Sequence, residues 1–399
     1  MKVRAAHLLF LLLTISFAFQ CKAKDKNRVV SGAEHTEQYF PLLKGKKIAV
    51  VANQTATLGE HHLVDSLKKS GITIKCVFAP EHGFRGEAGA GDKIASGIDK
   101  QTGIPIISLY GKHLKPSAKD LEGVKVVVFD IQDVGVRFYT YISTLQYVME
   151  ACAVLKIKLF VLDRPNPNGY YVDGPVMKKE FSSFVGLQPI PIVYGMTIGE
   201  YAKMLNGEGW LENKKRCDLT VIKLENYTHE SRPVLRVSPS PNLPDMDAIY
   251  LYPSFCLFEG THVSLGRGTS RPFRVIGFPG YKKNGAERDT SFTPKNIPGV
   301  AMNPPYVDTL CRGLSFIGKG YEVRNKGEVN VEVLSFMYER FGEKDKFFNS
   351  FFNKLAGNDE LQKQIKAHKT QAEIKKTWQK DLALFKTIRK KYLLYDDFK

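Results

Sequence analysis

The sequence lacks the signatures of several common enzyme classes. No G-x-G-x-x-G segment follows the first predicted strand and no P-loop is present, which disfavours a nicotinamide-dependent dehydrogenase. No G-x-S-x-G segment occurs, which argues against an ordinary α/β-hydrolase. No H-E-x-x-H segment occurs, and the runs Glu60-His61-His62 and Glu81-His82 lack the spacing of metal ligands. The sequence therefore predicts neither a cofactor nor a metal ion.

Cysteine is scarce, with 6 in 399 residues. After Cys21, the five that remain are widely spaced, and they form no C-x-x-C pair and no cluster with histidine. Two of them, Cys76 and Cys152, lie among apolar residues and are expected to be buried thiols. The pattern predicts no disulfide framework and no structural zinc site.

Acidic residues are outnumbered by basic ones, and the formal net charge is +17. Such a charge suits anionic surroundings, which include nucleic acid, an anionic membrane and an acidic cell-wall polymer. A lysine-rich surface in water, with no partner, is the simplest interpretation. No cluster of Lys and Arg interleaved with aromatic residues stands out, so we predict no nucleic-acid partner.

The N-terminus has the pattern of a secretory signal. Lys2 and Arg4 precede an uncharged run, Leu8–Phe19, of about 12 residues, which is too short to span a bilayer comfortably. Cys21 follows and resembles the lipidated cysteine of bacterial lipoproteins, although Phe19-Gln20 matches poorly the small residues usual before that cysteine. We predict an exported protein, either periplasmic or anchored to the membrane through Cys21.

Apolar runs alternate with amphipathic helical patterns over the first half of the chain. This alternation predicts an α/β fold whose mostly parallel sheet is covered on both faces. After about residue 180 the pattern changes to a smaller α+β domain with long loops and a helical C-terminus, and a helix is expected over Thr197–Leu205. The predicted strands are 47–53, 72–79, 104–109, 124–130 and 157–163, and the predicted segments are a signal peptide at 1–20, a linker at 21–45, an α/β domain at 46–190 and the α+β domain at 191–399.

Polar residues gather where the predicted strands end, and ligands bind beyond the carboxyl ends of strands in such sheets. After the second strand, the loop Pro80–Gly86 contains Glu81, His82 and Arg85. A carboxylate beside these two groups is a plausible acid/base catalyst, because neighbouring charges tune its pKa. A polar turn with local ion pairs is the alternative interpretation.

The fourth strand ends at Asp130, and Asp133, Arg137 and Tyr139 follow it. Aromatic rings beside hydrogen-bonding groups suit a sugar, and an arginine can hold a carboxylate through two parallel hydrogen bonds. The same residues could instead form a capped helix start with tyrosines in the core.

The fifth strand ends at Asp163, and Asn166 lies in the rigid polar loop that follows, which could line a pocket or form a tight turn. From the second half of the chain, Glu259 is the best candidate for a second carboxylate. The loop Gly266–Thr269 could hold an anion with its backbone N–H groups and Arg267.

Seven separated motifs carry a resemblance to a known family: Val51–Thr55, Pro80–Gly86, Phe129–Tyr141, Leu162–Pro167, Tyr194–Thr197, Pro239–Asn242 and Phe258–Thr261. In this order they resemble the exo-β-N-acetylmuramidase family, long described as a domain of unknown function. The resemblance implies a glycoside hydrolase that releases N-acetylmuramic acid from the non-reducing end of peptidoglycan fragments. It also implies a Rossmann-like N-terminal domain, a smaller C-terminal domain and a cleft between them.

A glycosidase needs an acid for the leaving oxygen and usually a second carboxylate or an equivalent. The resemblance makes Glu81 the expected general acid or acid/base, while Asp130 and Glu259 compete for the second role. The substrate's own acetamido oxygen is a third possibility, with Asp133 or Tyr139 orienting it. The residues expected to bind substrate are His82, Arg85, Asp133, Arg137, Tyr139, Asp163, Asn166, Asn242 and Arg267, of which the two arginines 137 and 267 are candidates for the lactyl carboxylate.

A different class of protein could use the same cleft and aromatic residues. A non-catalytic envelope protein that captures muropeptides is this alternative, and it predicts binding without hydrolysis.

Overall fold

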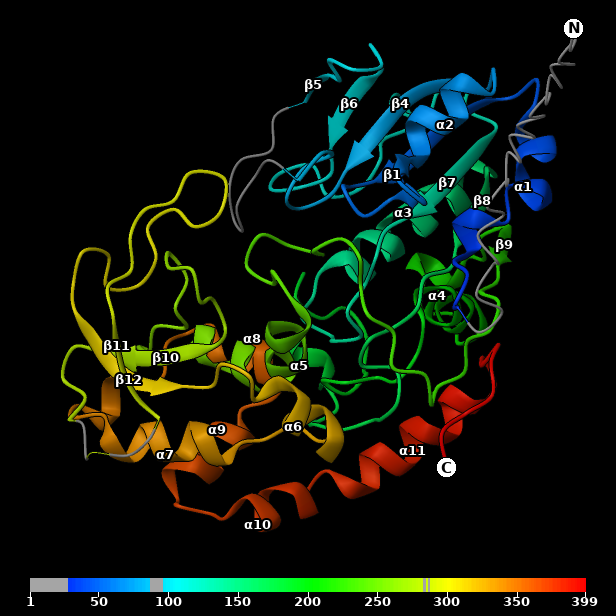
Figure 1. Cartoon of the computed structure of the whole chain (residues 1–399). Helices are drawn as coiled ribbons and strands as arrows, with labels where there is room; N and C mark the ends of the chain where they lie inside the picture. The colour runs from blue at the N-terminus through cyan, green and yellow to red at the C-terminus, as the bar shows by residue number, and fades with distance from the viewer. Residues whose placement is uncertain (1–27, 87–95, 283–284, 286–287) are drawn as a thin grey trace, which may run out of the picture.

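The computed structural model describes residues 28–86, 96–282, 285 and 288–399 (Figure 1). The expected signal peptide at 1–20 and Cys21 lie outside the described residues. No helix among the described residues is long and apolar enough to cross a membrane.

The first part of the chain forms the expected α/β sheet (Figure 1). Seven strands lie in the order β5-β6-β4-β1-β7-β8-β9, and all neighbouring pairs are parallel except β5 and β6. Each of the five predicted strands is present, so the predicted fold class is confirmed. The strands are β1 Lys47–Ala52, β4 Thr73–Ala79, β5 Gly97–Ile98, β6 Pro105–Ser108, β7 Val126–Asp130, β8 Lys158–Leu162 and β9 Leu219–Ile222.

Both faces of the sheet are covered by helices, as continuous apolar strands require. Along β1, Ile48 and Val50 pack into one buried cluster that contains residues of α1 (Thr36–Leu43) and α2 (Leu63–Lys69). The alternate side chains, Ala49 and Val51, point into a second and larger cluster, which contains residues of α3 (Tyr141–Leu155) and α4 (Ile198–Gly207). The two helix layers fix the strands, and with them the loops at their carboxyl ends.

Two predicted boundaries need correction. The described part of the expected linker at 21–45 is folded, since it contains α1 and buries Tyr39 and Leu43 completely. The sheet also extends past residue 190, because its edge strand β9 comes after α4. The expected helix start at Thr197 is confirmed. The backbone N–H of Thr197 donates a 2.9 Å hydrogen bond to the Glu200 carboxylate.

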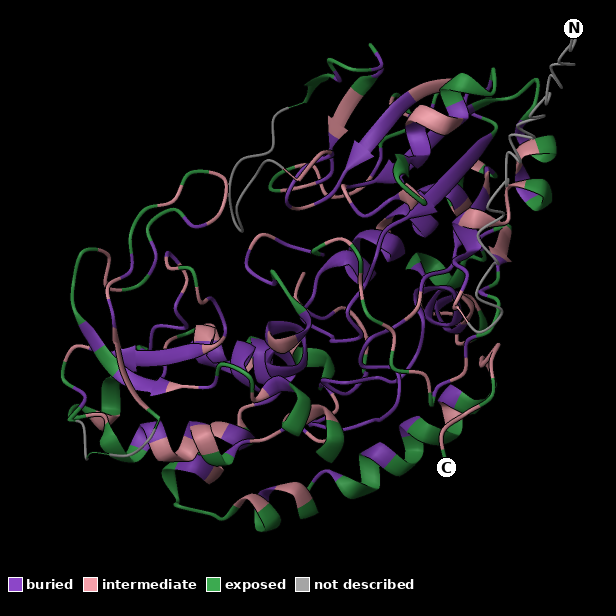
Figure 2. Ribbon diagram, viewed as in Figure 1, coloured by how far each residue is buried: buried purple, intermediate pink, exposed green. Residues whose placement is uncertain are grey.

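The second half of the chain builds a smaller antiparallel sheet, in the order β10-β12-β11, surrounded by helices. Figure 2 shows exposed outer faces on α10 and α11, as expected for lysine-rich surface helices. The elements are α5 Met246–Phe255, β10 Val275–Phe278, β11 Asp289–Phe292, β12 Cys311–Ser315, α6 Gly320–Lys326, α7 Glu332–Arg340, α8 Phe352–Ala356, α9 Glu360–Lys366, α10 Gln371–Lys376 and α11 Gln379–Lys390.

Short elements complete the fold: the hairpin β2 Thr57–Leu58 and β3 His61–His62, and the 3₁₀ helices η1 Gly32–Glu34, η2 Lys179–Phe181, η3 Glu212–Lys214, η4 Cys256–Gly260 and η5 Lys344–Lys346. The C-terminal tail returns to the first sheet, where the Tyr395 hydroxyl donates to Asp163 Oδ2 over 2.6 Å. Cys76 and Cys152 are buried, as expected, and the other three cysteines after Cys21 are buried as well; all five are free thiols.

Candidate active site

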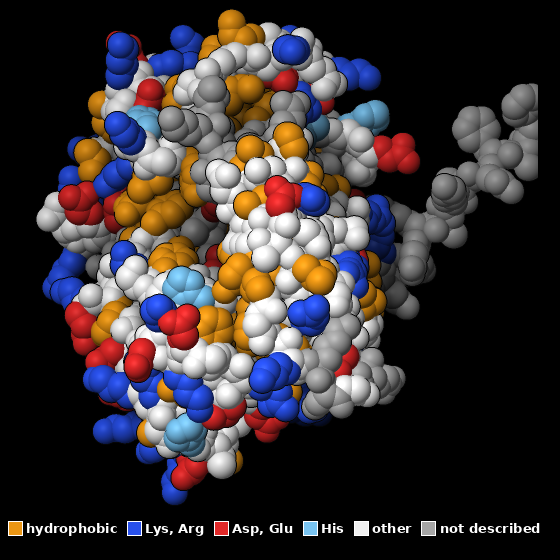
Figure 3. Space-filling model, turned by 90° about the vertical axis from the view of Figure 1, so that its left-hand side faces the viewer, with side chains coloured by type: hydrophobic (Ala, Val, Ile, Leu, Met, Phe, Trp, Pro, Cys, Tyr) orange, Lys and Arg blue, Asp and Glu red, His pale blue; other side chains and the backbone are white. Residues whose placement is uncertain are grey.

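A cavity of about 370 Å³ lies where the carboxyl ends of the sheet strands face the second half of the chain. The loop after β4 and the segment between β7 and α3 form one side of it, and η4 and residues 301–305 contribute to the other. Figure 3 shows a face of the molecule that is hollowed, with hydrophobic side chains beside the hollow. The cavity therefore draws its walls from segments far apart in the sequence.

Glu81 reaches this cavity from a tight turn after β4. The turn closes with a 3.0 Å hydrogen bond from the Gly83 N–H to the Pro80 carbonyl, and His82 adopts a left-handed backbone with φ of 70°. Two hydroxyl groups hold the Glu81 carboxylate: Tyr110 donates to Oε1 over 3.1 Å and Thr140 donates to Oε2 over 2.9 Å. The carboxylate is thus fixed in direction while it remains at the wall of a cavity.

Two buried tyrosines form the wall next to Glu81. The Tyr139 hydroxyl donates to the Pro239 carbonyl over 2.8 Å, and the Tyr141 hydroxyl accepts a 2.9 Å hydrogen bond from Asn53 Nδ2. Burial raises the pKa of both hydroxyls above the ordinary value for tyrosine, so both stay neutral at physiological pH. They offer neutral polar groups and ring faces to a ligand.

A second carboxylate, Glu259, enters the cavity from η4. Arg267 donates to Glu259 Oε1 through both Nε, at 3.2 Å, and Nη2. The guanidinium also lies 4.9 Å from the centre of the Phe273 ring, and its Nη1 donates to no group among the described residues. One edge of Arg267 holds the carboxylate and the other is available to an anionic ligand.

Five of the predicted site residues line this cavity: Glu81, His82, Tyr139, Glu259 and Arg267. Residues that the sequence did not single out also line it, among them Tyr110, Thr140, Ser240, Tyr252 and Cys256. Tyr110 directly follows the predicted strand 104–109, so the strand-end argument could have found it. Thr140 and Ser240 lie within the motifs Phe129–Tyr141 and Pro239–Asn242, whereas the places of Tyr252 and Cys256 depend on tertiary packing.

Asp130 and Asp163 lie away from the cavity, contrary to expectation. Asp130 is fully buried and forms a two-pronged ion pair with Arg164, with Nε–Oδ1 at 2.6 Å and Nη2–Oδ2 at 2.9 Å. Asp163 is also fully buried, and it accepts hydrogen bonds from the Thr197 hydroxyl over 2.7 Å and from Tyr395. Both carboxylates hold the sheet to its surroundings, and we do not retain them as site residues.

Asp133 and Arg137 are likewise internal. Asp133 Oδ2 accepts hydrogen bonds from the Tyr194 hydroxyl and from the Gly135 N–H, the latter over 2.6 Å. The Arg137 guanidinium has no exposed surface and donates to the carbonyls of Pro175, Ile190 and Leu355. Neither residue lines the cavity, so neither is retained as a substrate ligand.

Three further expected ligands do not line the cavity either. Arg85 pairs with Asp65 and Asp99, and Asn166 donates to the Met196 carbonyl over 2.7 Å. Asn242 donates to the Val300 carbonyl over 2.8 Å, close to the cavity wall formed by residues 301–305. These side chains shape loops around the site. No group of His, Cys, Asp and Glu among the described residues could hold a metal ion.

Asp133 makes a testable contribution to stability. Burial raises its pKa from 3.8 to about 6, so the folded state holds this proton more tightly than the unfolded state. Its stabilising contribution is complete below about pH 4 and is lost as the pH rises through about 6. We expect Asp133→Asn to gain about 3 kcal/mol in the free energy of unfolding relative to wild type between pH 4 and 7.

Urea unfolding at several pH values measures this difference between variant and wild type. Asp381→Asn, on the exposed face of α11, is the matched control and should track wild type across the range. A difference for Asp133→Asn that does not change with pH would contradict the raised pKa.

Known proteins resemble this chain along nearly its whole length. The family models "Exo-beta-N-acetylmuramidase NamZ, N-terminal" and "Exo-beta-N-acetylmuramidase NamZ, C-terminal" match residues 48–247 and 250–395. The "Peptidoglycan beta-N-acetylmuramidase NamZ" of Bacillus subtilis (strain 168) is 38% identical over 373 residues, which cover 90% of this chain and 89% of that protein.

Two crystal structures of DUF1343 family proteins from Bacteroides fragilis NCTC 9343 share the fold. One is 47% identical with a TM-score of 0.85, and covers 93% of this chain and 99% of its own. The other is 27% identical with a TM-score of 0.75, and covers 93% of this chain and 100% of its own.

Proposed function

This chain belongs to the exo-beta-N-acetylmuramidase NamZ family and is a glycoside hydrolase of peptidoglycan, and we propose that it releases N-acetylmuramic acid from the non-reducing end of peptidoglycan fragments. One observation supports this most. Glu81 and Glu259, from opposite halves of the chain, line one cavity and are each held by hydrogen bonds from neighbouring side chains. Glycoside hydrolysis needs an acid for the leaving oxygen and usually a second carboxylate, and these two residues can supply both.

Glu81 is the proposed general acid. In its protonated form it donates the proton to the glycosidic oxygen while the bond from that oxygen to the anomeric carbon breaks. The remainder of the fragment, which is the leaving group, departs with this proton on its hydroxyl oxygen, and the Tyr110 and Thr140 hydroxyls donate to the carboxylate that remains. The same carboxylate can then take a proton from the attacking water if the reaction proceeds in two steps.

Glu259 is the proposed second catalytic carboxylate. The competing residue, Asp130, forms an ion pair with Arg164 and does not line the cavity. As a nucleophile it attacks the anomeric carbon, and as a base it takes a proton from water that attacks there. The alternative is attack by the acetamido oxygen of the substrate, with Tyr139 orienting that group. Asp133 does not line the cavity and drops out of this role.

Purified protein tests the activity directly. We expect it to release N-acetylmuramic acid from its 4-nitrophenyl β-glycoside and from the disaccharide in which it is linked to N-acetylglucosamine. Protein that binds these compounds and never hydrolyses them would contradict the proposal and favour a binding protein of the envelope.

Arg267 is the proposed ligand of the lactyl carboxylate, because it lines the cavity and its Nη1 has no hydrogen-bond partner among the described residues. A hydrogen bond between charged groups stabilises a complex by about 1.5–3 kcal/mol, so we expect Arg267→Gln to lower kcat/KM by about 10- to 100-fold. The rate loss is measured on the 4-nitrophenyl glycoside of N-acetylmuramic acid.

The matched comparison is the corresponding N-acetylglucosaminide, which lacks the lactyl group. Any slow hydrolysis of that compound should change far less in Arg267→Gln. Equal losses on the two substrates would mean that Arg267 acts only through Glu259.

The polymer lies outside the cytoplasm, so the activity requires export. The basic start and the uncharged run to Phe19 support a signal peptide, and Cys21 is the proposed site of a lipid anchor. Mass spectrometry of the mature N-terminus tests both, with Cys21→Ala as the control for lipidation.

A further inference from the structure

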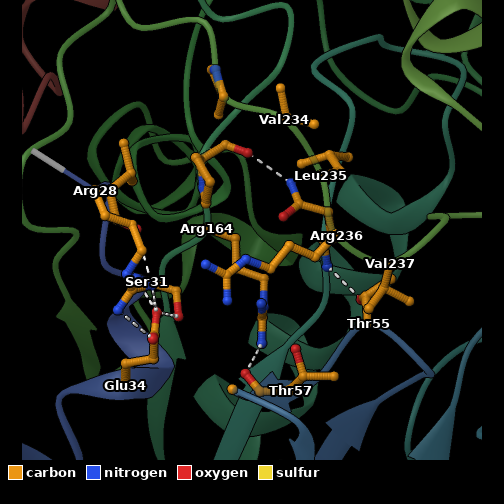
Figure 4. Close-up of a pocket in the computed structure, with 15 residues that line it drawn as sticks. Arg28, Ser31, Glu34, Thr55, Thr57, Arg164, Val234, Leu235, Arg236 and Val237 are labelled. Carbon is orange, nitrogen blue, oxygen red and sulfur yellow. Dashed lines mark hydrogen bonds and ion pairs between the residues drawn. The ribbon is translucent and has the colours of Figure 1, made fainter. Parts of the chain in front are cut away.

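A second cavity, of about 240 Å³, lies at the same edge of the sheet as the active site but shares no lining residue with it (Figure 4). One part of its lining comes from residues that follow sheet strands: Thr55 after β1, Gln132 after β7 and Arg164 after β8. Residues 233–237 supply another part. In the sheet, β1 has β4 as its neighbour on one side and β7 as its neighbour on the other. The chain passes from β1 to β4, β5 and β6 on the first side and then crosses back to form β7 on the second side. This is the point where strand order reverses, at which open α/β sheets form ligand crevices.

Arg164 is a preorganised donor in this cavity. Its side chain is only 8% exposed, and Nε and Nη2 are held by Asp130 and by the Thr57 carbonyl. The remaining nitrogen, Nη1, donates to no group among the described residues, and it is not one of their buried, unsatisfied atoms. A buried guanidinium with one accessible and unused edge is costly unless an acceptor reaches it.

Arg236 supplies a second guanidinium from the opposite wall. Figure 4 shows its side chain reaching from residues 233–237 toward Arg164. It is exposed and forms no hydrogen bond or ion pair with the described part of the chain. Two like charges beside one cavity attract an anion between them.

The charge of the cavity limits the anion that it can hold. Among the described residues, Arg28 is paired with Glu34 at 2.8 Å and Arg164 with Asp130 at 2.6 Å, while Arg236 has no carboxylate partner. Together, these described side chains carry one net positive charge, which matches a monoanion, and the carboxylates of Glu34 and Asp130 repel a second negative charge. A planar carboxylate also matches the geometry of a guanidinium edge.

Part of the remaining lining is apolar. Pro165, Pro233, Leu235 and Val237 form the wall around the arginines, and Val234 is 69% exposed beside them. An apolar group next to the carboxylate would cover this surface. We propose that the cavity between Arg164 and Arg236 is a binding site for a small organic monocarboxylate, separate from the active site.

Calorimetric titration of the whole protein at constant ionic strength tests this site. The probes are N-acetyl-D-alanine, its neutral amide and inorganic phosphate. We expect the acid to bind at least tenfold more tightly than the amide and more tightly than phosphate. Arg236→Gln should weaken binding of the acid at least tenfold and leave glycoside hydrolysis unchanged, because Arg236 is exposed and outside the active-site cavity.

Arg232→Gln is the matched control, since Arg232 is an exposed arginine on the same segment that stacks on Tyr170 and does not line the cavity. It should bind the acid as wild type does. Equal affinity for acid and amide, tighter binding of phosphate, or unchanged binding by Arg236→Gln would each overturn the proposal.

A competition arm identifies the source of the carboxylate. N-acetylmuramic acid that displaces N-acetyl-D-alanine from Arg267→Gln protein indicates a sugar acid, and failure to displace it indicates an amino-acid or peptide carboxylate. The binding result does not depend on hydrolysis, so it stands or fails separately from the proposed enzyme activity.

Discussion

Glu81→Gln is expected to slow the release of N-acetylmuramic acid from its disaccharide with N-acetylglucosamine by about 1,000-fold, within the 10²- to 10⁴-fold range for a general acid. The amide keeps the size of the side chain, and its oxygen can accept the hydrogen bond of one of the two hydroxyl groups of Tyr110 and Thr140, while its NH2 group can donate to the other. It has no proton to give to a sugar hydroxyl, which is a poor leaving group. Substrate binding should therefore survive while turnover falls.

Tyr110→Phe is the matched control for position. It removes one of the two hydroxyl groups that hold Glu81 and leaves the acid itself, so we expect a loss of about tenfold or less. Steady-state rates and binding of the disaccharide to both variants make the comparison. A Glu81→Gln enzyme that retains wild-type turnover would remove Glu81 from the mechanism.

Glu259→Gln is the second large effect, with an expected loss of about 100- to 10,000-fold on the 4-nitrophenyl glycoside. A good leaving group needs little help from an acid, so this substrate isolates the group that attacks or activates water. Azide added to Glu259→Ala should restore turnover, because azide can attack the anomeric carbon in place of the missing carboxylate or water.

Two controls separate catalysis from folding and from substrate assistance. Arg267→Lys retains a cation beside Glu259 and should keep most of the turnover that Glu259→Gln loses. A small loss in Glu259→Gln, with no response to azide, would instead indicate attack by the acetamido oxygen. NMR of the anomer first released by wild type then distinguishes a nucleophile, with carboxyl groups about 5–5.5 Å apart, from a base, at about 6.5–9.5 Å.

The sheet could be predicted because its strands are short apolar runs separated by helical patterns. Strand ends also located Glu81, since a turn that follows β4 must emerge at the carboxyl edge. The motif that contains Glu259 was identified from its resemblance to the family, which does not show which residues lie near it in space. In the structure, Glu81 and Glu259 line the same cavity.

The same strand-end rule selected Asp130 and Asp163, which proved internal. Their partners lie far along the chain: Arg164 is 34 residues from Asp130, and Tyr395 is 232 residues from Asp163. Sequence spacing does not reveal whether a carboxylate meets a buried cation or a ligand. Arg137 failed for the same reason, because three backbone carbonyls from distant segments take up its guanidinium.

The prediction of a linker at 21–45 was wrong for its described part, because the polar residues there include the exposed positions of a short amphipathic helix, α1. Buried Tyr39 donates to the Ala33 carbonyl over 2.7 Å, which binds α1 to η1 across a few polar positions. A helix of 8 residues gives too short a periodic pattern to recognise before its packing is known.

The most direct measurement of the central claim is the leaving-group dependence of the Glu81→Gln defect. The ratio of wild-type to variant kcat/KM is determined for the disaccharide and for the 4-nitrophenyl glycoside. If Glu81 protonates the glycosidic oxygen, the ratio is at least tenfold larger for the disaccharide, whose leaving group needs the proton. Equal ratios for the two substrates would contradict proton donation by Glu81.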